Sequence, residues 1–337
     1  MKPAVVLAGL AGLAGAAWLV IHIGLHSVWD AVTAVGWRGL ALLCLYGAAN
    51  FCLLGTAWFV LDPPYGWSKF TIFAWGRAVR DSAGEILPFS QIGGLVIGAR
   101  AVVLRGIGQP VAFATTVVDM AMEMAAQIAF IAAGLALLAI DLPGAGWQSP
   151  VVRSTAIGLV IAIPIACGFL VLQRKGFALL ERAAKRLLPA LAAGAAAVSA
   201  ALNEIHNAPR RMFASFCLHI AGWLAGAFGT WFALLLLGSR IDFADAFAIE
   251  AVLAALRSGA FFVPAAIGVQ EAGYALLMPL FGLPPQLGIA VSLLKRAREI
   301  ALGVPILVAW QIAEGRSALT VARDLKASTS AQAEPRG

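Results

Sequence analysis

The sequence predicts an all-α polytopic membrane protein with an inverted-repeat architecture of about six full spans and two re-entrant hairpins. The first observation is composition: 61% of the residues are hydrophobic and 12% are charged, whereas soluble domains carry about 25% charged residues. The second is the presence of long uncharged runs, such as 39–61 and 154–172. The third is two apolar segments, 69–105 and 243–282, that contain charges together with Pro and Gly. A chain of this composition is expected to be solvated by lipid.

The first repeat is expected at residues 1–142. Its elements are, in order, spans at 4–23 and 37–61, a hairpin at 69–105 and a span at 111–140. Each span has the roughly 20 mainly apolar residues that a bilayer requires. The first run ends in Trp18–His22, which is typical of an aromatic membrane interface, so we interpret it as a span and not as a cleaved signal peptide.

The second repeat is expected at residues 143–313. Its elements are a span at 151–172, a basic segment at 173–211, a span at 212–238, a hairpin at 243–282 and a span at 286–313. Residues 314–337 follow as a tail whose Ser, Thr, Ala and Gln content predicts disorder. Aromatic residues fall at the expected interfaces, as they do in the belts of membrane proteins: Trp29, Trp37, Tyr65, Trp67 and Trp147.

The basic segment sets the orientation. It carries seven Lys and Arg residues against two Glu residues, and such segments lie on the cytoplasmic side. It is either an amphipathic helix that binds anionic lipids of the inner leaflet or a solvated connector. Both alternatives place the two termini of a multi-pass protein in the cytoplasm. Arg100, Arg105 and the tail then share the cytoplasmic side.

The segments 69–105 and 243–282 do not fit simple spans. Each charge at the bilayer centre costs about 2.5–3.5 kcal/mol, so a helix surrounded by lipid would not tolerate them. Each segment is long enough for two half-helices of about 15 residues with a Pro/Gly break between them, and we interpret both as re-entrant hairpins. The alternatives are two full spans per segment, or a surface helix and one span. Inverted halves with broken helices are typical of secondary transporters.

Polar residues of the two hairpins form the first half of the candidate binding site. In the first hairpin they are Arg77, Arg80, Asp81, Glu85, Pro88 and Gln91. In the second they are Arg257, Pro264, Gly268, Gln270 and Glu271. The arginines and the free N–H groups of broken helices would bind a phosphate head group. Glu85 and Glu271 would either carry a coupling proton or accept hydrogen bonds from free backbone N–H groups.

Two spans supply the other half of the candidate binding site. Asp119, Glu123 and Gln127 stand at i, i+4 and i+8 and therefore line one helix face. The last span carries charges at the same depth: Lys295, Arg296, Arg298 and Glu299. We expect Lys295 to pair with Glu299, and Asp119 and Glu123 to neutralise the arginines of this span. The alternative is that all these charges are structural pairs with no ligand.

Other classes of function lack their signatures. The four cysteines lie in apolar segments, the four histidines are scattered, and no metal-ligand spacing or phosphate loop is present. We expect no metal and no cofactor. The net charge of +7 gathers in connecting segments, so nucleic acid is not an expected partner.

Two stretches carry a resemblance to a known family. Glu85-Ile-Leu-Pro-Phe-Ser-Gln-Ile-Gly-Gly94 and Pro264-Ala-Ala-Ile-Gly-Val-Gln-Glu-Ala272 resemble the two hallmark regions of the lysylphosphatidylglycerol synthase transmembrane-region family, also called flippase-like. Pro264, Gly268 and Glu271 match its Pro-x-x-x-Gly-x-x-Glu pattern. Val117–Glu123 and Leu293–Glu299 are similar to two of its spans. The glutamines at 91 and 270 are closest to the hopanoid-biosynthesis-associated subgroup.

The resemblance implies a flippase-like protein of the bacterial inner membrane that moves a lipid, a hopanoid or a phospholipid, between leaflets. If the lipid is a hopanoid, a largely neutral polyol, carboxylates and amides would matter more than arginines. Two-domain members carry a soluble aminoacyl-transferase domain after the spans. None is expected after residue 313 here, so we do not expect this chain to aminoacylate a lipid. The alternatives are a lipid-modifying enzyme that uses Asp119, Glu123 or Glu271 as acid/base groups, and a scaffold that docks lipid-synthesis partners through 173–211. The sequence is also compatible with a homo-oligomer.

Overall fold

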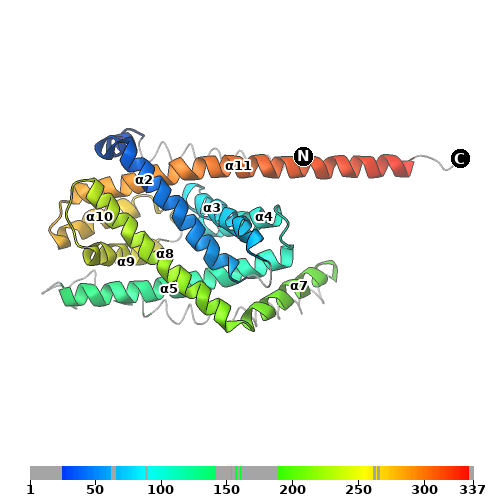
Figure 1. The fold of residues 1–337 in the computed structure, drawn as a ribbon, viewed down its shortest axis with the longest axis horizontal. Coiled ribbons are helices and arrows are strands. Elements are labelled where there is room, and N and C mark those ends of the chain that lie inside the picture. Colours follow the sequence, from blue (N-terminus) through cyan, green and yellow to red (C-terminus); the bar gives the residue numbers. More distant parts are fainter. Residues whose placement is uncertain are drawn as a thin grey trace.

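The computed structural model describes residues 25–61, 66–87, 90–141, 189–260 and 266–333, with isolated positions at 153, 156–157, 160 and 263. Throughout this part of the chain every regular element is a helix (Figure 1). The predicted spans 4–23 and 151–172, and most of the basic segment before residue 189, lie outside the described residues, apart from those isolated positions.

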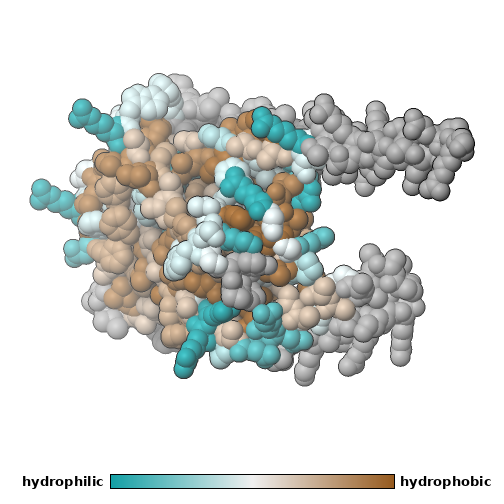
Figure 2. Space-filling view, turned by 45° about the vertical axis from the view of Figure 1, so that its right-hand side comes forward, coloured by the Kyte–Doolittle hydropathy of each residue, from teal (hydrophilic) through white to brown (hydrophobic). Residues whose placement is uncertain are grey.

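Three of the described helices are long and apolar enough to cross a membrane: α2 (Leu25–Phe59), α5 (Gln109–Asp141) and α8 (Pro209–Leu236). Spans 37–61, 111–140 and 212–238 are therefore confirmed as helices of spanning length. Brown apolar side chains cover much of the face in Figure 2, and several long teal side chains project from its edges. An apolar exterior of this kind is suited to lipid.

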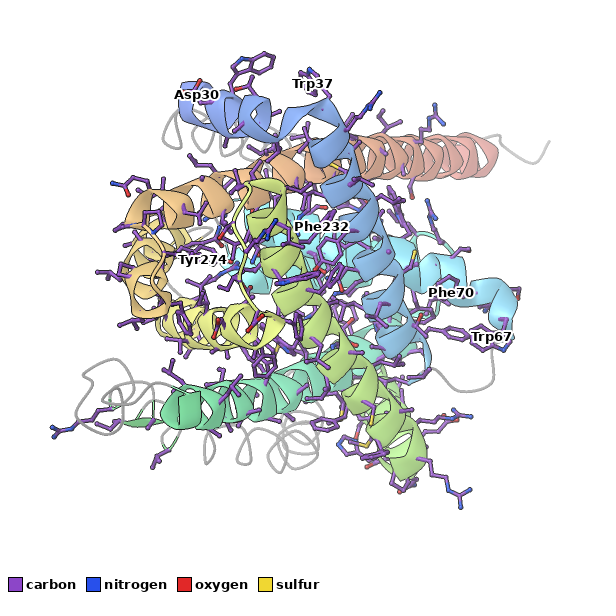
Figure 3. The ribbon with its side chains drawn as sticks, turned by 60° about the vertical axis from the view of Figure 1, so that its left-hand side comes forward. Asp30, Trp37, Trp67, Phe70, Phe232 and Tyr274 are labelled. Atoms are coloured by element: carbon purple, nitrogen blue, oxygen red, sulfur yellow. The ribbon has the colours of Figure 1, made fainter. Side chains whose placement is uncertain are left out.

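Gly36 divides α2 into two helical stretches because its φ of 69° and ψ of 167° are not helical. The second stretch ends at Phe59 and is about 34 Å long at 1.5 Å per residue, close to the roughly 30 Å of a hydrocarbon core. Trp37 lies at its start and Trp67 beyond its end (Figure 3), and both are exposed. These two tryptophans thus mark opposite ends of a helix of bilayer length.

The predicted first hairpin is a pair of helices, α3 (Phe70–Ile86) and α4 (Ser90–Val103), that pack against each other after the short helix η1 (Trp67–Lys69). Glycine permits this packing: a Cβ on Gly94 would lie 2.6 Å from the carbonyl oxygen of Arg80. With 17 and 14 residues, both helices are shorter than a full span.

The predicted second hairpin is also a helix, a break and a helix. α9 (Phe243–Gly259) is followed by α10 (Val269–Leu277) and η3 (Met278–Phe281). Ala266 and Gly268 in the break have positive φ, 48° and 79°, a region that favours glycine. α9 has 17 residues and α10 has nine, again fewer than a span requires.

The remaining helices are α7 (Pro189–His206), which lies within the predicted basic segment, and α11 (Pro285–Ala333). In Figure 1, α11 crosses the whole body and its red C-terminal part projects beyond it. The prediction of disorder at 314–337 is therefore wrong for residues 314–333, which are helical. A helix that is already formed can be extended through residues such as Ala, Leu, Arg and Lys without a new nucleation cost.

The helices of the second half share one apolar core with α5. Buried residues of α8, α9, α10 and α11, among them Leu234, Ile249, Leu277 and Leu294, pack together there. α11 also contacts α2 and α3, and α5 contacts α8 and α9. This packing brings the polar faces of both hairpins and of α5 and α11 into the interior.

Candidate functional site

Charged side chains gather in three clusters inside the bundle, which we name by their contents. The arginine–carboxylate cluster contains Arg77, Arg80, Asp81, Asp119, Glu123 and His219. The hairpin junction contains Glu85, Arg257, Glu271, Arg296, Arg298 and Glu299. The lysine cluster contains Thr230, Glu250, Tyr274 and Lys295.

The arginine–carboxylate cluster joins α3 to α5. Arg77 donates to Glu123 from Nη2 at 2.6 Å and from Nη1 at 3.0 Å. Arg80 donates to Asp119 at 2.5 Å and to Glu123 at 2.6 Å. Arg77 also binds Asp81 one turn along α3, at 2.8 Å. Because buried guanidinium and carboxylate groups satisfy one another here, the cluster is tolerated in an apolar interior.

His219 reaches the same cluster from α8. Its Nε2 lies 3.0 Å from Asp119 Oδ1, and both side chains are fully buried. The carboxylates of Asp81, Asp119 and Glu123 outnumber the two guanidinium groups, so a donor from α8 completes the hydrogen bonding of Asp119. His219 is not among the predicted site residues, because a single histidine in an apolar span gives no spacing signal.

The expectation that Asp119 and Glu123 neutralise the arginines of span 286–313 is wrong. Their partners come from α3, whose Arg77 and Arg80 lie on the face that packs toward α5. Depth in the membrane suggested the pairing with α11, but depth does not determine which helices are neighbours. Gln127, one turn beyond Glu123, donates instead to Ser258 of α9 at 2.9 Å.

At the hairpin junction, side chains of both hairpins meet α11. Arg257 of α9 donates to Glu85 of α3 at 2.7 Å. Arg296 of α11 lies 3.6 Å from Glu85 and 3.5 Å from Glu271 of α10. Glu85 is the penultimate residue of α3 and Glu271 lies in the first turn of α10. The residues beside the breaks of the two hairpins therefore both contact the guanidinium group of Arg296.

The Gly-x-x-Glu part of the motif has a direct structural role. Gly268 precedes α10 with a positive φ, and Glu271 Oε2 accepts a hydrogen bond of 2.8 Å from the Gly268 backbone N–H. This is the reach-back half of a capping box. The alternative that Glu271 binds a free backbone N–H is thus confirmed. Its other oxygen accepts from Ser292, which in turn accepts from Gln270.

The lysine cluster overturns the expected pairing of Lys295 with Glu299. Lys295 Nζ lies 2.8 and 3.0 Å from the two oxygens of Glu250, and it also contacts Tyr274 and Thr230. Glu299 instead binds Arg296 at 3.3 Å and Arg298 at 3.4 Å. Lys295 and Arg296 are consecutive on α11, so they point to different sides of the helix and join different clusters.

Three members of the lysine cluster are not among the predicted site residues. Glu250 carries a usable signal, since it is a carboxylate in the apolar part of segment 243–282. Thr230 and Tyr274 carry none, because hydroxyl side chains are common in membrane helices. Pro88 and Pro264 lie outside the described residues, and only the backbone of Gln91 is described, within α4.

The arginine–carboxylate cluster and the hairpin junction combine buried side chains with partly exposed ones, whereas the lysine cluster is buried throughout. Side chains of Glu85, Arg257 and Glu271 are 22%, 26% and 24% exposed, whereas Arg296 is 1% exposed. Glu123 is 23% exposed and its partner Arg77 is 4% exposed. The open groups could exchange a partner in the protein for a polar group of a ligand. The described residues contain no cluster of histidine, cysteine and carboxylate side chains that could hold a metal ion.

Comparison with known proteins gives one positive result. No curated protein and no solved structure matches the chain. A family model described as the lysylphosphatidylglycerol synthase TM region matches residues 5–306, which is most of the chain and includes all three clusters. This family is a membrane domain related to lipid handling. The chain therefore belongs to the lysylphosphatidylglycerol synthase transmembrane-region family.

Proposed function

We propose that this protein moves a membrane lipid between the leaflets of the bacterial inner membrane, with the polar head of the lipid bound at the hairpin junction. The observation that carries the proposal is the position of Arg296, within 3.6 Å of Glu85 and 3.5 Å of Glu271. One buried cation thus links residues beside both helix breaks. Such a meeting of broken helices is the usual location of a transporter substrate site.

Helix lengths support re-entrant hairpins. Four helices of 17, 14, 17 and nine residues are too short to cross a bilayer singly. A break lined by Glu85 or Glu271 would be costly in lipid but is tolerated where it lines a polar chamber. The proposal therefore includes two inverted repeats, residues 1–142 and 143–313, with both termini in the cytoplasm.

The exposure of the junction supports binding over a purely structural role. Arg257, Glu85 and Glu271 each leave about a quarter of the side chain accessible, so a ligand can contact them from outside the protein. A head-group phosphate would bind Arg257 and Arg296, and head-group hydroxyls would donate to Glu85 or Glu271. Both a phospholipid and a hopanoid fit this set of groups. When the lipid leaves, the charges pair with each other again.

The test is a leaflet-resolved assay in proteoliposomes. Purified protein is reconstituted with fluorescent phosphatidylglycerol, and dithionite reports the labelled lipid that reaches the outer leaflet. The Arg296→Gln variant is expected to slow this movement by at least about tenfold, because it removes the charge that both hairpins share. Arg100→Gln is the matched control, since Arg100 is 47% exposed and its ion pair with Glu314, at 3.0 Å, lies outside the three clusters.

Two results would contradict the proposal. One is an Arg296→Gln variant that folds and moves lipid at the wild-type rate. The other is a covalently altered lipid, detected by mass spectrometry after incubation with wild-type protein, which would favour an enzyme that modifies lipids. A parallel assay with an extractable hopanoid in place of the phospholipid tests the second substrate class.

A further inference from the structure

A cavity lies between α2 and α8, outside the three clusters. Its volume is about 360 Å³, and it is lined by Tyr46, Ala49, Asn50, Leu53, Ala225 and Phe228. The two helices run side by side (Figures 1 and 3). They touch closely on either side of the cavity, where Gly222 faces Leu54 and Gly229 faces Tyr46. The cavity is therefore a local gap in an otherwise tight helix contact.

Asn50 is the unusual residue in this lining. Its Oδ1 atom is buried and has no hydrogen-bond partner, and no other bond to its amide is present within the part of the chain that the structure describes. Asn50 lies between Gly36 and Phe59 of α2, so it is about 13 Å or more from either end of that helical stretch. At this depth no bulk water can satisfy an amide, and an unpaired one is costly.

The cavity leads toward the hairpin junction through Tyr46. The Tyr46 hydroxyl donates to the carbonyl of Ala225 at 2.5 Å, and the guanidinium of Arg298 lies 5.7 Å from the centre of the Tyr46 ring. Arg298 binds Glu299, and Glu299 binds Arg296. Arg298 belongs to the hairpin junction, so Tyr46 both lines the cavity and contacts a residue of the junction.

We propose that this cavity binds a membrane lipid that bears hydroxyl groups, with the hydroxyl on Asn50 and the apolar part against Leu53 and Phe228. A hydroxyl both donates and accepts, as an amide does, so one group can pair with either end of the Asn50 side chain. The apolar lining suits a lipid chain. The gap between α2 and α8 is then a lateral port through which the lipid reaches the hairpin junction. This route to the junction rests on the proposed function, whereas binding of the lipid in the cavity does not.

The experiment measures which lipid occupies the cavity. The photo-crosslinker p-benzoylphenylalanine replaces Ala49 in the full chain, in vesicles that contain equal amounts of dioleoyl phosphatidylglycerol and dioleoyl phosphatidylmethanol. These lipids carry the same charge, but only the first has head-group hydroxyls. The adducts identified by mass spectrometry are expected to favour phosphatidylglycerol about fivefold, the effect of one net hydrogen bond. The same probe at Leu45, which is 68% exposed and outside the cavity, should show no preference.

The role of Asn50 is tested by Asn50→Leu in the same crosslinking protein. Adducts should still form, with the preference reduced to about one. Thermal stability in detergent should be equal to or above that of wild type, because no hydrogen bond within the described residues is lost. The inference is overturned if position 49 yields no more lipid adduct than position 45, if it crosslinks to a second copy of the chain instead, or if Asn50→Leu keeps the preference.

The translocation assay separates this inference from the proposed function. If Arg296→Gln stops lipid movement and keeps the adduct preference at position 49, the cavity binds lipid independently of the junction, as proposed. If the wild-type protein moves no lipid, the proposed function fails, and the adduct ratio still decides whether the cavity is a lipid site.

Discussion

Arg77 binds Glu123 through two hydrogen bonds, Nη2 to Oε1 at 2.6 Å and Nη1 to Oε2 at 3.0 Å. The planar guanidinium matches the carboxylate, so the pair fixes the register of α3 against α5 as well as their contact. The first hairpin is thereby attached to a helix of spanning length. This attachment positions Glu85, two turns along α3, at the hairpin junction.

Arg77→Lys should destabilise the protein although the charge is kept. In Arg77, Nη1 and Nη2 donate to the two Glu123 oxygens while Nε donates to Asp81. A lysine ammonium cannot reproduce this geometry, so part of the cluster loses its hydrogen-bond partners. We expect a loss of about 2–3 kcal/mol in the free energy of unfolding, measured by thermal or denaturant unfolding in detergent micelles. Arg100→Lys, at an exposed ion pair, should change it by less than about 0.5 kcal/mol. Equal effects at the two positions would argue against a special role for the paired geometry.

Replacement of His219 should depend on whether the new side chain can donate a hydrogen bond. In His219→Gln, the amide N–H can still reach Asp119 Oδ1, which the His219 ring contacts at 3.0 Å, so little change is expected. In His219→Leu that oxygen stays buried without this donor, and stability should fall by about 1–3 kcal/mol. The same unfolding measurement compares the two variants. A leucine variant as stable as the glutamine variant would mean that Asp119 does not need the α8 donor.

The sequence predicts the helical elements better than it predicts the ion pairs. Both hairpins follow from charges, Pro and Gly inside apolar segments, because each charge in lipid demands a local break or a polar neighbour. The pairing of Asp119 with Arg80 does not follow, since 39 positions separate them and only the packing of α3 on α5 brings them together. Which residues form an ion pair is therefore determined by the tertiary packing of the helices.

The lysine cluster illustrates the same limit. Lys295 and Glu299 are at i, i+4 on one helix, a spacing that stabilises isolated helices by a few tenths of a kcal/mol. In the folded chain Lys295 binds Glu250, 45 residues away, and two hydroxyl groups. Four hydrogen-bonding contacts in a buried site outweigh one local pair. Local spacing therefore predicted a weak interaction that a stronger distant one replaced.

Lys295 and Glu250 should behave as a coupled pair in a double-mutant cycle. Lys295→Met leaves the Glu250 carboxylate buried without its counter-charge, and we expect a loss of about 3–5 kcal/mol in the free energy of unfolding. Glu250→Leu should cost a similar amount for the converse reason. The double variant should be more stable than either single variant, because no unpaired charge remains. Additive losses would instead indicate that the two residues stabilise the fold independently.

The backbone break before α10 depends on the conformation of Gly268. Gly268 has a φ of 79°, where a Cβ is strained, although no atom lies within 4 Å of that position. Gly268→Ala should therefore lower stability by about 1–2 kcal/mol through backbone strain and not through a clash. Gly268→Asn should cost a similar amount, because asparagine tolerates the left-handed helical region, whose ψ is positive, and Gly268 has a ψ of −35°. Gly108→Ala is the control, since it too has open space but an ordinary φ.

Because Gly268 donates its N–H to Glu271, the same backbone strain should also disturb the junction. In the translocation assay, Gly268→Ala and Gly268→Asn are both expected to reduce lipid movement, whereas the control Gly108→Ala is not. A Gly268→Ala variant that unfolds like wild type would show that the positive φ at residue 268 does not need glycine. A variant that is destabilised yet moves lipid at the wild-type rate would mean that the cap on α10 acts in stability alone, and that Arg296 does not depend on the position of Glu271 for its function.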